Sequence, residues 1–118
     1  MVVESPDFEA GAKAAGLGDD EMRRIIDHVA RRPDAGDLIP GTGGARKVRF
    51  AARGKGKSGG YRVITFYSGG ALPVFLLTVF SKGRKIDLTQ AERNELRREL
   101  AGLAEDYRRG VRRHVGGG

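Results

Sequence analysis

The sequence predicts an α+β domain in which helices cover one side of a small antiparallel sheet. Three observations support this fold class: amphipathic helical patterns near both ends, β-type stretches grouped in the middle, and glycine-rich turns between those stretches. A chain of 118 residues can bury a core without disulfides, and this one has no cysteine. We expect residues 1–112 to form a single domain and residues 113–118 to be a disordered tail.

The N-terminal segment predicts a strand followed by a helix. Residues 1–5 have the composition of a short edge strand, which would flank a three-stranded core. Ser5 or Asp7 is a suitable N-cap for a first helix that runs to about Ala15, where glycines interrupt the chain.

A second helix is expected to begin at Asp19. Three acidic residues lie in its first turn, where the helix dipole favours negative charge. Its buried stripe follows the i, i+3, i+4, i+7 spacing and consists of Met22, Ile25, Ile26 and Val29. Pro33 ends this helix, and residues 33–44 are predicted to be a loop.

Residues 41–67 predict a basic β-hairpin. In its first strand Lys47 and Arg49 alternate with Val48 and Phe50, so cations and apolar side chains fall on opposite faces. The loop of residues 53–60 contains four glycines, two lysines and a serine, and the second strand of residues 61–67 is β-branched and aromatic. Arg62 is the only charged residue of that second strand.

The C-terminal half predicts one more strand and a helix. Residues 72–80 are apolar at both alternations, which is typical of a central strand covered on both faces. Thr89 and Glu92 have the spacing of a capping box and should begin the last helix. The apolar stripe of that helix would consist of Leu96, Leu100, Leu103, Tyr107 and Val111.

The positive charge is concentrated in one module. Residues 38–86 contain ten cations and no Asp or Glu, although the whole chain has a net charge of only +7. An inert solvated surface usually mixes both signs, so this segregation indicates a nucleic acid or another phosphate-bearing partner.

Several familiar motifs are excluded by their context. The segment 54–59, GKGKSG, matches GxGxxG by letters, but it precedes a strand where a dinucleotide site needs a helix. His28 and His114 are isolated, so we expect no metal site and no cofactor. The longest apolar run is too short to span a membrane and no signal peptide is recognisable, so we expect a cytoplasmic location without membrane contact.

The segments GTGGARKVRFAARGKGKSGGYRVITFY and PVFLLTVFSKGRKIDLTQAE resemble the RelE/ParE superfamily of bacterial toxins, and most closely its HigB-like branch. The resemblance covers about residues 38–96 and implies a RelE-like fold. It also implies the toxin of a type II toxin–antitoxin pair, which cuts translated mRNA on the ribosome. The resemblance implies that the cut is made without a metal, by attack of a ribose 2′-hydroxyl on its own 3′ phosphate.

Carried over to this sequence, the family pattern implies a catalytic set of residues, and the other cations of the acid-free segment are predicted to bind RNA. The catalytic set consists of Lys47, Arg49, Arg62 and Lys82. Arg62 would bind the scissile phosphate and Lys47 would act as a cation or as a base. The RNA-binding set consists of Arg46, Arg53, Lys55, Lys57, Arg84 and Lys85. Many relatives place a tyrosine or histidine after the apolar strand, and SKGRKIDLT has neither, which leaves the general base unassigned.

The resemblance also implies partners and leaves two alternatives. The expected partners are the ribosome, mRNA and a cognate antitoxin of HigA-like, helix-turn-helix type. One alternative is a ParE-like inhibitor of DNA gyrase, which shares the fold but cuts no RNA. The other is a degenerate module that binds RNA without catalysis.

Overall fold

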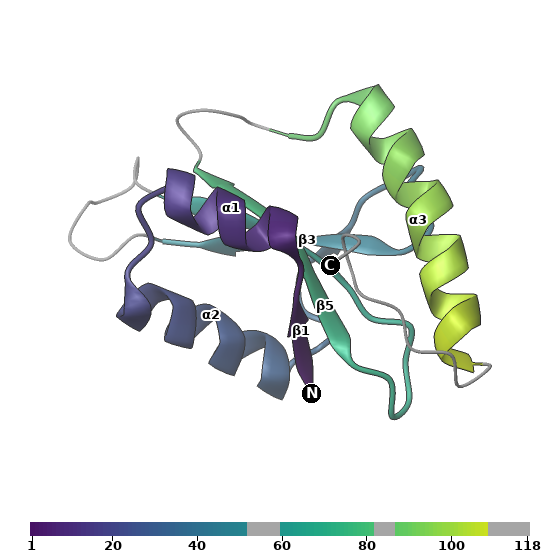
Figure 1. Ribbon diagram of the computed structural model, residues 1–118, viewed down its shortest axis with the longest axis horizontal. Helices are drawn as coiled ribbons and strands as arrows, with labels where there is room; N and C mark the ends of the chain where they lie inside the picture. Colours follow the sequence, from purple (N-terminus) through teal and green to yellow (C-terminus); the bar gives the residue numbers. More distant parts are fainter. Residues whose placement is uncertain (52–59, 82–86, 109–118) are drawn as a thin grey trace.

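The computed structural model describes residues 1–51, 60–81 and 87–108, and confirms the α+β class. The elements follow the predicted order, with one strand that was not expected (Figure 1). They are β1 (Val2–Glu4), α1 (Pro6–Ala14), α2 (Asp19–Arg31), β2 (Asp37–Leu38), β3 (Ala45–Phe50), β4 (Tyr61–Phe66), β5 (Val74–Ser81) and α3 (Gln90–Arg108). The tail of residues 113–118 lies outside the described residues.

The sheet has five strands in the order β1-β5-β4-β3-β2. The antiparallel core of β3, β4 and β5 is as predicted, and β1 is the expected edge strand. However, β1 runs parallel to β5, so the sheet is mixed and the prediction of an antiparallel sheet was wrong at this edge. The physical reason is that α1, α2 and three antiparallel connections separate β1 from β5, namely β2 to β3, β3 to β4 and β4 to β5, and this path returns the chain in the direction of β1.

The predicted loop of residues 33–44 contains the unexpected strand β2. Asp37 and Leu38 pair with Lys47 and Arg46 of β3. A turn holds this pairing, because the Thr42 hydroxyl donates to the Ile39 carbonyl at 2.7 Å and accepts from the Ala45 N–H at 3.0 Å. Two residues show no alternation, so strand propensity could not reveal β2.

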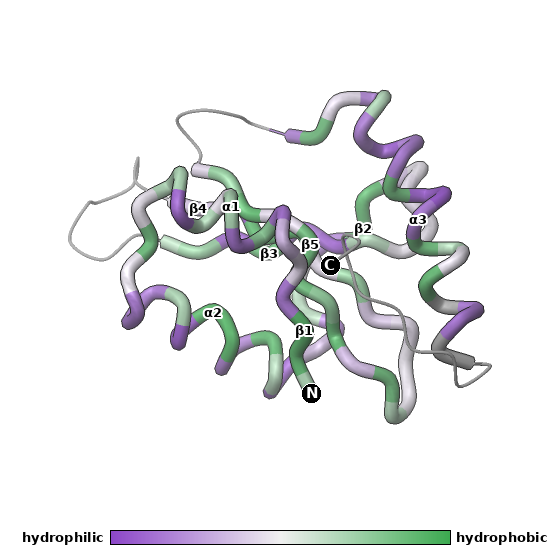
Figure 2. The backbone as a smooth tube through the Cα atoms, in the orientation of Figure 1, coloured by the Kyte–Doolittle hydropathy of each residue, from purple (hydrophilic) through white to green (hydrophobic). Residues whose placement is uncertain are grey.

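The helices lie on both faces of the sheet, which corrects the prediction that they cover one side (Figure 1). One core lies between α1, α2 and the sheet, and its largest fully buried side chains include Phe8 and Ile25. The other lies between α3 and the sheet and includes Leu100, Ile64 and Phe66. Because β4 and β5 carry apolar side chains on both faces, each face needs a helical cover. Figure 2 shows the hydrophobic stretches along these central strands and polar stretches along the helices.

A β-bulge in β5 determines which side chains face α3. Ile64 pairs with Thr78 and Thr65 pairs with Leu76, so Leu77 is the extra residue. The bulge shifts the alternation beyond it by one residue. As a result Val79 packs in the α1–α2 core, and Phe80 lies on the α3 side, opposite Arg62 in the ladder.

The predicted capping box begins α3. The Thr89 N–H donates to Glu92 Oε1 at 2.8 Å, and the Glu92 N–H donates to Thr89 Oγ1 at 3.2 Å. Leu96, Leu100 and Leu103 pack in the α3 core as expected from their spacing. The remaining predicted stripe positions, the side chain of Tyr107 and the whole of Val111, lie outside the described part of the chain.

Candidate nucleic-acid interface

The site is built on the face of β3 and β4 that points to the α3 side. The alternation of β3 sends Val48 and Phe50 into the α1–α2 core and leaves Lys47 and Arg49 on the opposite face, as the sequence predicted. In β4, Arg62 has the same parity as Ile64, which packs in the α3 core. Lys47, Arg49 and Arg62 therefore share one face.

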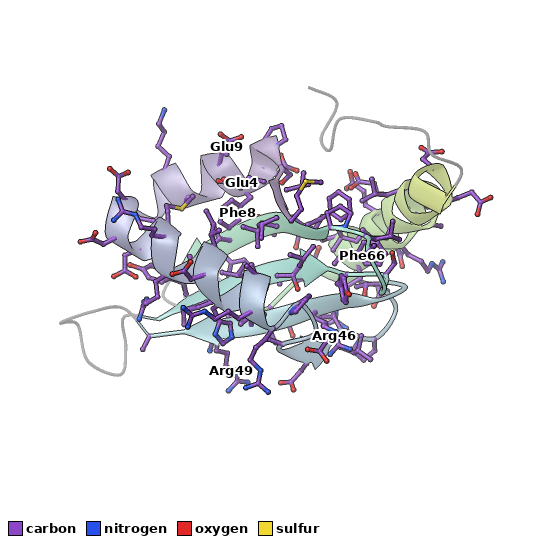
Figure 3. All side chains as sticks on the ribbon, turned by 90° about the horizontal axis from the view of Figure 1, so that it is seen from below. Glu4, Phe8, Glu9, Arg46, Arg49 and Phe66 are labelled. Carbon is purple, nitrogen blue, oxygen red and sulfur yellow. The ribbon has the colours of Figure 1, made fainter. Side chains whose placement is uncertain are left out.

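Arg49 and Arg62 stand directly opposite each other in the antiparallel ladder. Arg49 is exposed and extends from the β3 side of the sheet (Figure 3). Arg62 is half-buried, and its Nη1 makes a long hydrogen bond of 3.5 Å to the Tyr61 carbonyl. Within residues 1–51, 60–81 and 87–108, no carboxylate lies within 4.0 Å of either guanidinium. Two opposed like charges are unfavourable, and an anion bound between them would remove the repulsion.

Lys47 differs from these arginines because it has a counter-ion. Its Nζ lies 3.2 Å from Asp87 Oδ2, and Arg93 Nη2 lies 3.3 Å from the same oxygen. The other oxygen of Asp87 accepts the Leu88 N–H at 2.8 Å. That hydrogen bond is the largest cause of a lowered pKa of Asp87; burial opposes it, and Lys47 and Arg93 lower the pKa further. The carboxylate is thus fixed at one oxygen and shared by two cations at the other.

Neither Asp87 nor Arg93 was predicted from the sequence as a site residue. Asp87 is the first carboxylate after the acid-free segment, which is the one signal in the sequence that marks it. Arg93 lies three residues before Leu96, so it shares the side of α3 that faces the sheet. Only the packing of α3 on this face of the sheet brings Arg93 close to Lys47 and Asp87.

Of the predicted RNA-binding set, the structure describes Arg46, and Arg46 does not lie on this face. Its side chain projects from β3 on the face opposite that of Lys47 and Arg49, and its Nη1 donates to the Gly36 carbonyl at 3.0 Å. Figure 3 shows Arg46 and Arg49 extending from the same strand. The other predicted residues lie outside the described part of the chain: Arg53, Lys55, Lys57, Lys82, Arg84 and Lys85.

Arg24 of α2 contacts the loop end of the β3–β4 hairpin from the opposite face of the sheet. Its guanidinium forms an ion pair with Glu21 at 2.6 Å, donates to the Ala51 carbonyl, and lies 5.9 Å from the centre of the Phe50 ring. Tyr61 lies on this side too: burial raises its pKa, the Glu21 charge raises it further, and Arg24 opposes both. These contacts join α2 to the ends of β3 and β4, where Arg49 and Arg62 lie.

His28, the one histidine among the described residues, lies away from the interface. His28 is half-buried, and its ring meets the edge of Phe50 at a centroid distance of 5.3 Å, which agrees with the predicted surface histidine. His114 lies outside the described residues. A search of the described residues for three or more His, Asp or Glu side chains able to hold a metal ion finds none. Among the same residues, no helix is long and apolar enough to cross a membrane.

The fold and the site define a small α+β protein with a cationic face of arginines and lysine on a β-hairpin. Residues 2–110 match the family described as the RelE toxin of the RelE / RelB toxin-antitoxin system. The match spans most of the chain, and the protein therefore belongs to the RelE toxin family. This confirms the predicted RelE/ParE-type toxin, and family membership implies an antitoxin as its partner.

Proposed function

We propose that this protein is a ribosome-dependent mRNA endonuclease of the HigB-like branch, acting in the cytoplasm. The observation that supports it best is the Arg49–Arg62 pair, two opposed cations without a counter-ion among the described residues of a RelE-family chain. A phosphodiester is an anion that such a pair binds well, because each guanidinium offers a planar fork of donors.

The reaction forms one bond to phosphorus and breaks another. The ribose 2′-oxygen attacks the adjacent 3′ phosphorus, the bond from phosphorus to the 5′-oxygen of the next nucleotide breaks, and a 2′,3′-cyclic phosphate and a 5′-hydroxyl result. The 2′-hydroxyl proton leaves to a base, and the departing 5′-oxygen gains a proton. Negative charge accumulates on the phosphorane between these events, and preorganised cations stabilise it; loss of one such donor costs about 3 kcal/mol of transition-state stabilisation.

The residues have separate roles in this proposal. Arg62 holds the non-bridging oxygens of the reacting phosphate, and Arg49 contributes its charge from across the ladder. Lys47 is held in an ion pair with Asp87 at 3.2 Å, so in this proposal it contributes positive charge and the base stays unassigned. Lys82 belongs to the same catalytic set on the family pattern alone.

The antitoxin in this proposal is a HigA-like helix-turn-helix protein that keeps the toxin from the ribosome. Without it, the chain should arrest growth when expressed. The test is 5′-end mapping of cellular mRNA after brief induction of the wild type, of Arg62→Ala and of Arg31→Ala. Arg31 is an exposed cation at the end of α2 and is a matched control for loss of charge.

New 5′ ends inside translated frames should be present with the wild type and Arg31→Ala, and be lost with Arg62→Ala. Growth arrest with DNA damage signalling and no new mRNA ends would instead identify a ParE-like inhibitor of DNA gyrase. RNA binding without arrest or cleavage would identify a degenerate module.

A further inference from the structure

Lys47 and Arg93 come from distant parts of the chain and converge on one oxygen atom. Lys47 is in β3 and Arg93 is in the first turn of α3, yet both reach Asp87 Oδ2, at 3.2 and 3.3 Å. An anionic oxygen between an ammonium and a guanidinium is also the geometry in which proteins hold a phosphate oxygen. Asp87 therefore occupies a position that suits a phosphate.

The surroundings allow this carboxylate to be replaced. The side chain of Asp87 is 37% exposed, while those of Lys47 and Arg93 are 18% and 26% exposed. Ion pairs at such half-exposed positions are weak, so the exchange of one anion for another costs little. The two cations exceed the single carboxylate by one charge, so the cluster still attracts an anion.

The cluster also lies beside the Arg49–Arg62 pair. Lys47 and Arg49 are two residues apart on the same face of β3, which separates their Cα atoms by about 7 Å. A single RNA strand carries one negative charge per nucleotide, so adjacent phosphates can lie on the two cation pairs together.

We propose that Lys47 and Arg93 form a second phosphate site for single-stranded RNA, and that Asp87 fills this site until an RNA phosphate replaces it. The proposal deepens the proposed function and rests on it. Arg93 is then an RNA-binding residue, and Asp87 is a competitor built into the site that limits the affinity for RNA.

The test compares RNA binding by the wild type, Asp87→Asn, Arg93→Gln and Arg98→Gln. Asn keeps the shape of Asp87 and can still accept the Leu88 N–H, but it removes the negative charge from the two cations. Arg98 is exposed on α3 and is the control for loss of one positive charge from the same helix. The probe is a short 2′-O-methylated RNA, which cannot be cleaved by 2′-oxygen attack, and binding is measured by fluorescence anisotropy at several salt concentrations.

Asp87→Asn should bind RNA about twofold to fivefold more tightly than the wild type, because the competing charge is gone. Arg93→Gln should bind more weakly than Arg98→Gln, and its slope of log affinity against log salt should be shallower by about 0.7. Thermal melting of each variant verifies that it is folded.

Two results would overturn the proposal: RNA binding by folded Asp87→Asn that is equal to or weaker than wild type, or equal binding by Arg93→Gln and Arg98→Gln. Since the probe is not cleaved, these outcomes do not depend on whether the protein cuts mRNA. Failure of the nuclease proposal would be seen separately, in the 5′-end mapping.

Discussion

Arg49 and Arg62 face each other across the β3–β4 ladder as a directly opposed pair of like charges. Cross-strand pairs normally stabilise a sheet, whereas like charges opposite each other destabilise it. Sequences retain unfavourable pairs of this kind chiefly at functional sites. Because the pair lies beside Lys47, the destabilising repulsion falls at the candidate site.

The first prediction concerns the repulsion itself. Arg49→Ala and Arg62→Ala should each raise the free energy of unfolding, by about 0.2 to 1 kcal/mol at low salt, because either change removes the repulsion. The double variant should gain less than the two single gains together, since the interaction can be removed only once. Urea unfolding at two salt concentrations measures this, and additive gains at both would show that the two guanidinium groups do not interact.

The sequence was sufficient to predict most elements because their signals are local. The capping box of Thr89 and Glu92, the alternation of β3 and the stripe of α2 each depend on residues within a few positions of one another. The two-residue strand β2 carries no such signal, because its pairing depends on the Thr42 turn.

The side of the sheet that α3 covers could not be predicted in the same way. An amphipathic helix shows which of its own faces is buried, but not which face of a sheet it packs against. Asp87 and Arg93 join Lys47 only because α3 covers the face that carries Lys47. The bulge at Leu77, which turns Phe80 to that face, is likewise a property of the β4–β5 register and not of local composition.

The second prediction tests the close packing of α1 on β5. A Cβ at Gly11 would lie 2.4 Å from the Val79 carbonyl oxygen, so Gly11→Ala should force the helix away from the strand. The clash should outweigh the better helix propensity of alanine, worth about 1 kcal/mol, and lower the free energy of unfolding by about 1 to 3 kcal/mol. Thermal and urea unfolding measure the loss.

Gly18→Ala is the control for this change. No atom lies within 4 Å of a Cβ at Gly18, which is the N-cap of α2, so only a capping cost of up to about 1 kcal/mol is expected. Equal stability of Gly11→Ala and the wild type would mean that α1 does not approach β5 as closely as described.

The third prediction concerns the pH dependence that Asp87 produces. The Leu88 N–H, Lys47 and Arg93 lower its pKa in the folded state, against the effect of burial. A lowered folded pKa adds stability above the unfolded pKa, near 4, and this stability is lost as the pH falls through the folded pKa. The free energy of unfolding of the wild type should therefore exceed that of Asp87→Asn by less than about 1 kcal/mol near neutral pH, because the ion pairs of Asp87 are half-exposed.

That difference should shrink below about pH 4 and vanish at lower pH. Urea unfolding across this range measures it, with Asp27→Asn as the control. Asp27 is exposed in the middle of α2, and no cation lies within 4.0 Å of it among the described residues, so its loss should change stability little at any pH. A difference between wild type and Asp87→Asn that grows on acidification would contradict the ion pairs at Asp87.

The last prediction separates Arg24 from its neighbour Arg23. Arg24→Gln removes the 2.6 Å ion pair with Glu21, the hydrogen bond to the Ala51 carbonyl and the contact with the Phe50 ring. Hydrogen bonds to charged groups contribute about 1.5 to 3 kcal/mol, so the ends of β3 and β4 should open more often. Arg23→Gln removes the same charge from α2, but Arg23 is 76% exposed, and its one ion pair among the described residues is long.

Hydrogen exchange of the Phe50 and Tyr61 amides therefore discriminates between the two variants. These residues are cross-strand partners at the loop end of the hairpin, one position beyond the Arg49–Arg62 pair. Exchange should be faster in Arg24→Gln and unchanged in Arg23→Gln. Because Arg49 and Arg62 are held by the same strand ends, Arg24→Gln should also weaken RNA binding, although Arg24 lies on the opposite face. Unchanged exchange in Arg24→Gln would show that α2 does not stabilise the loop end of the hairpin.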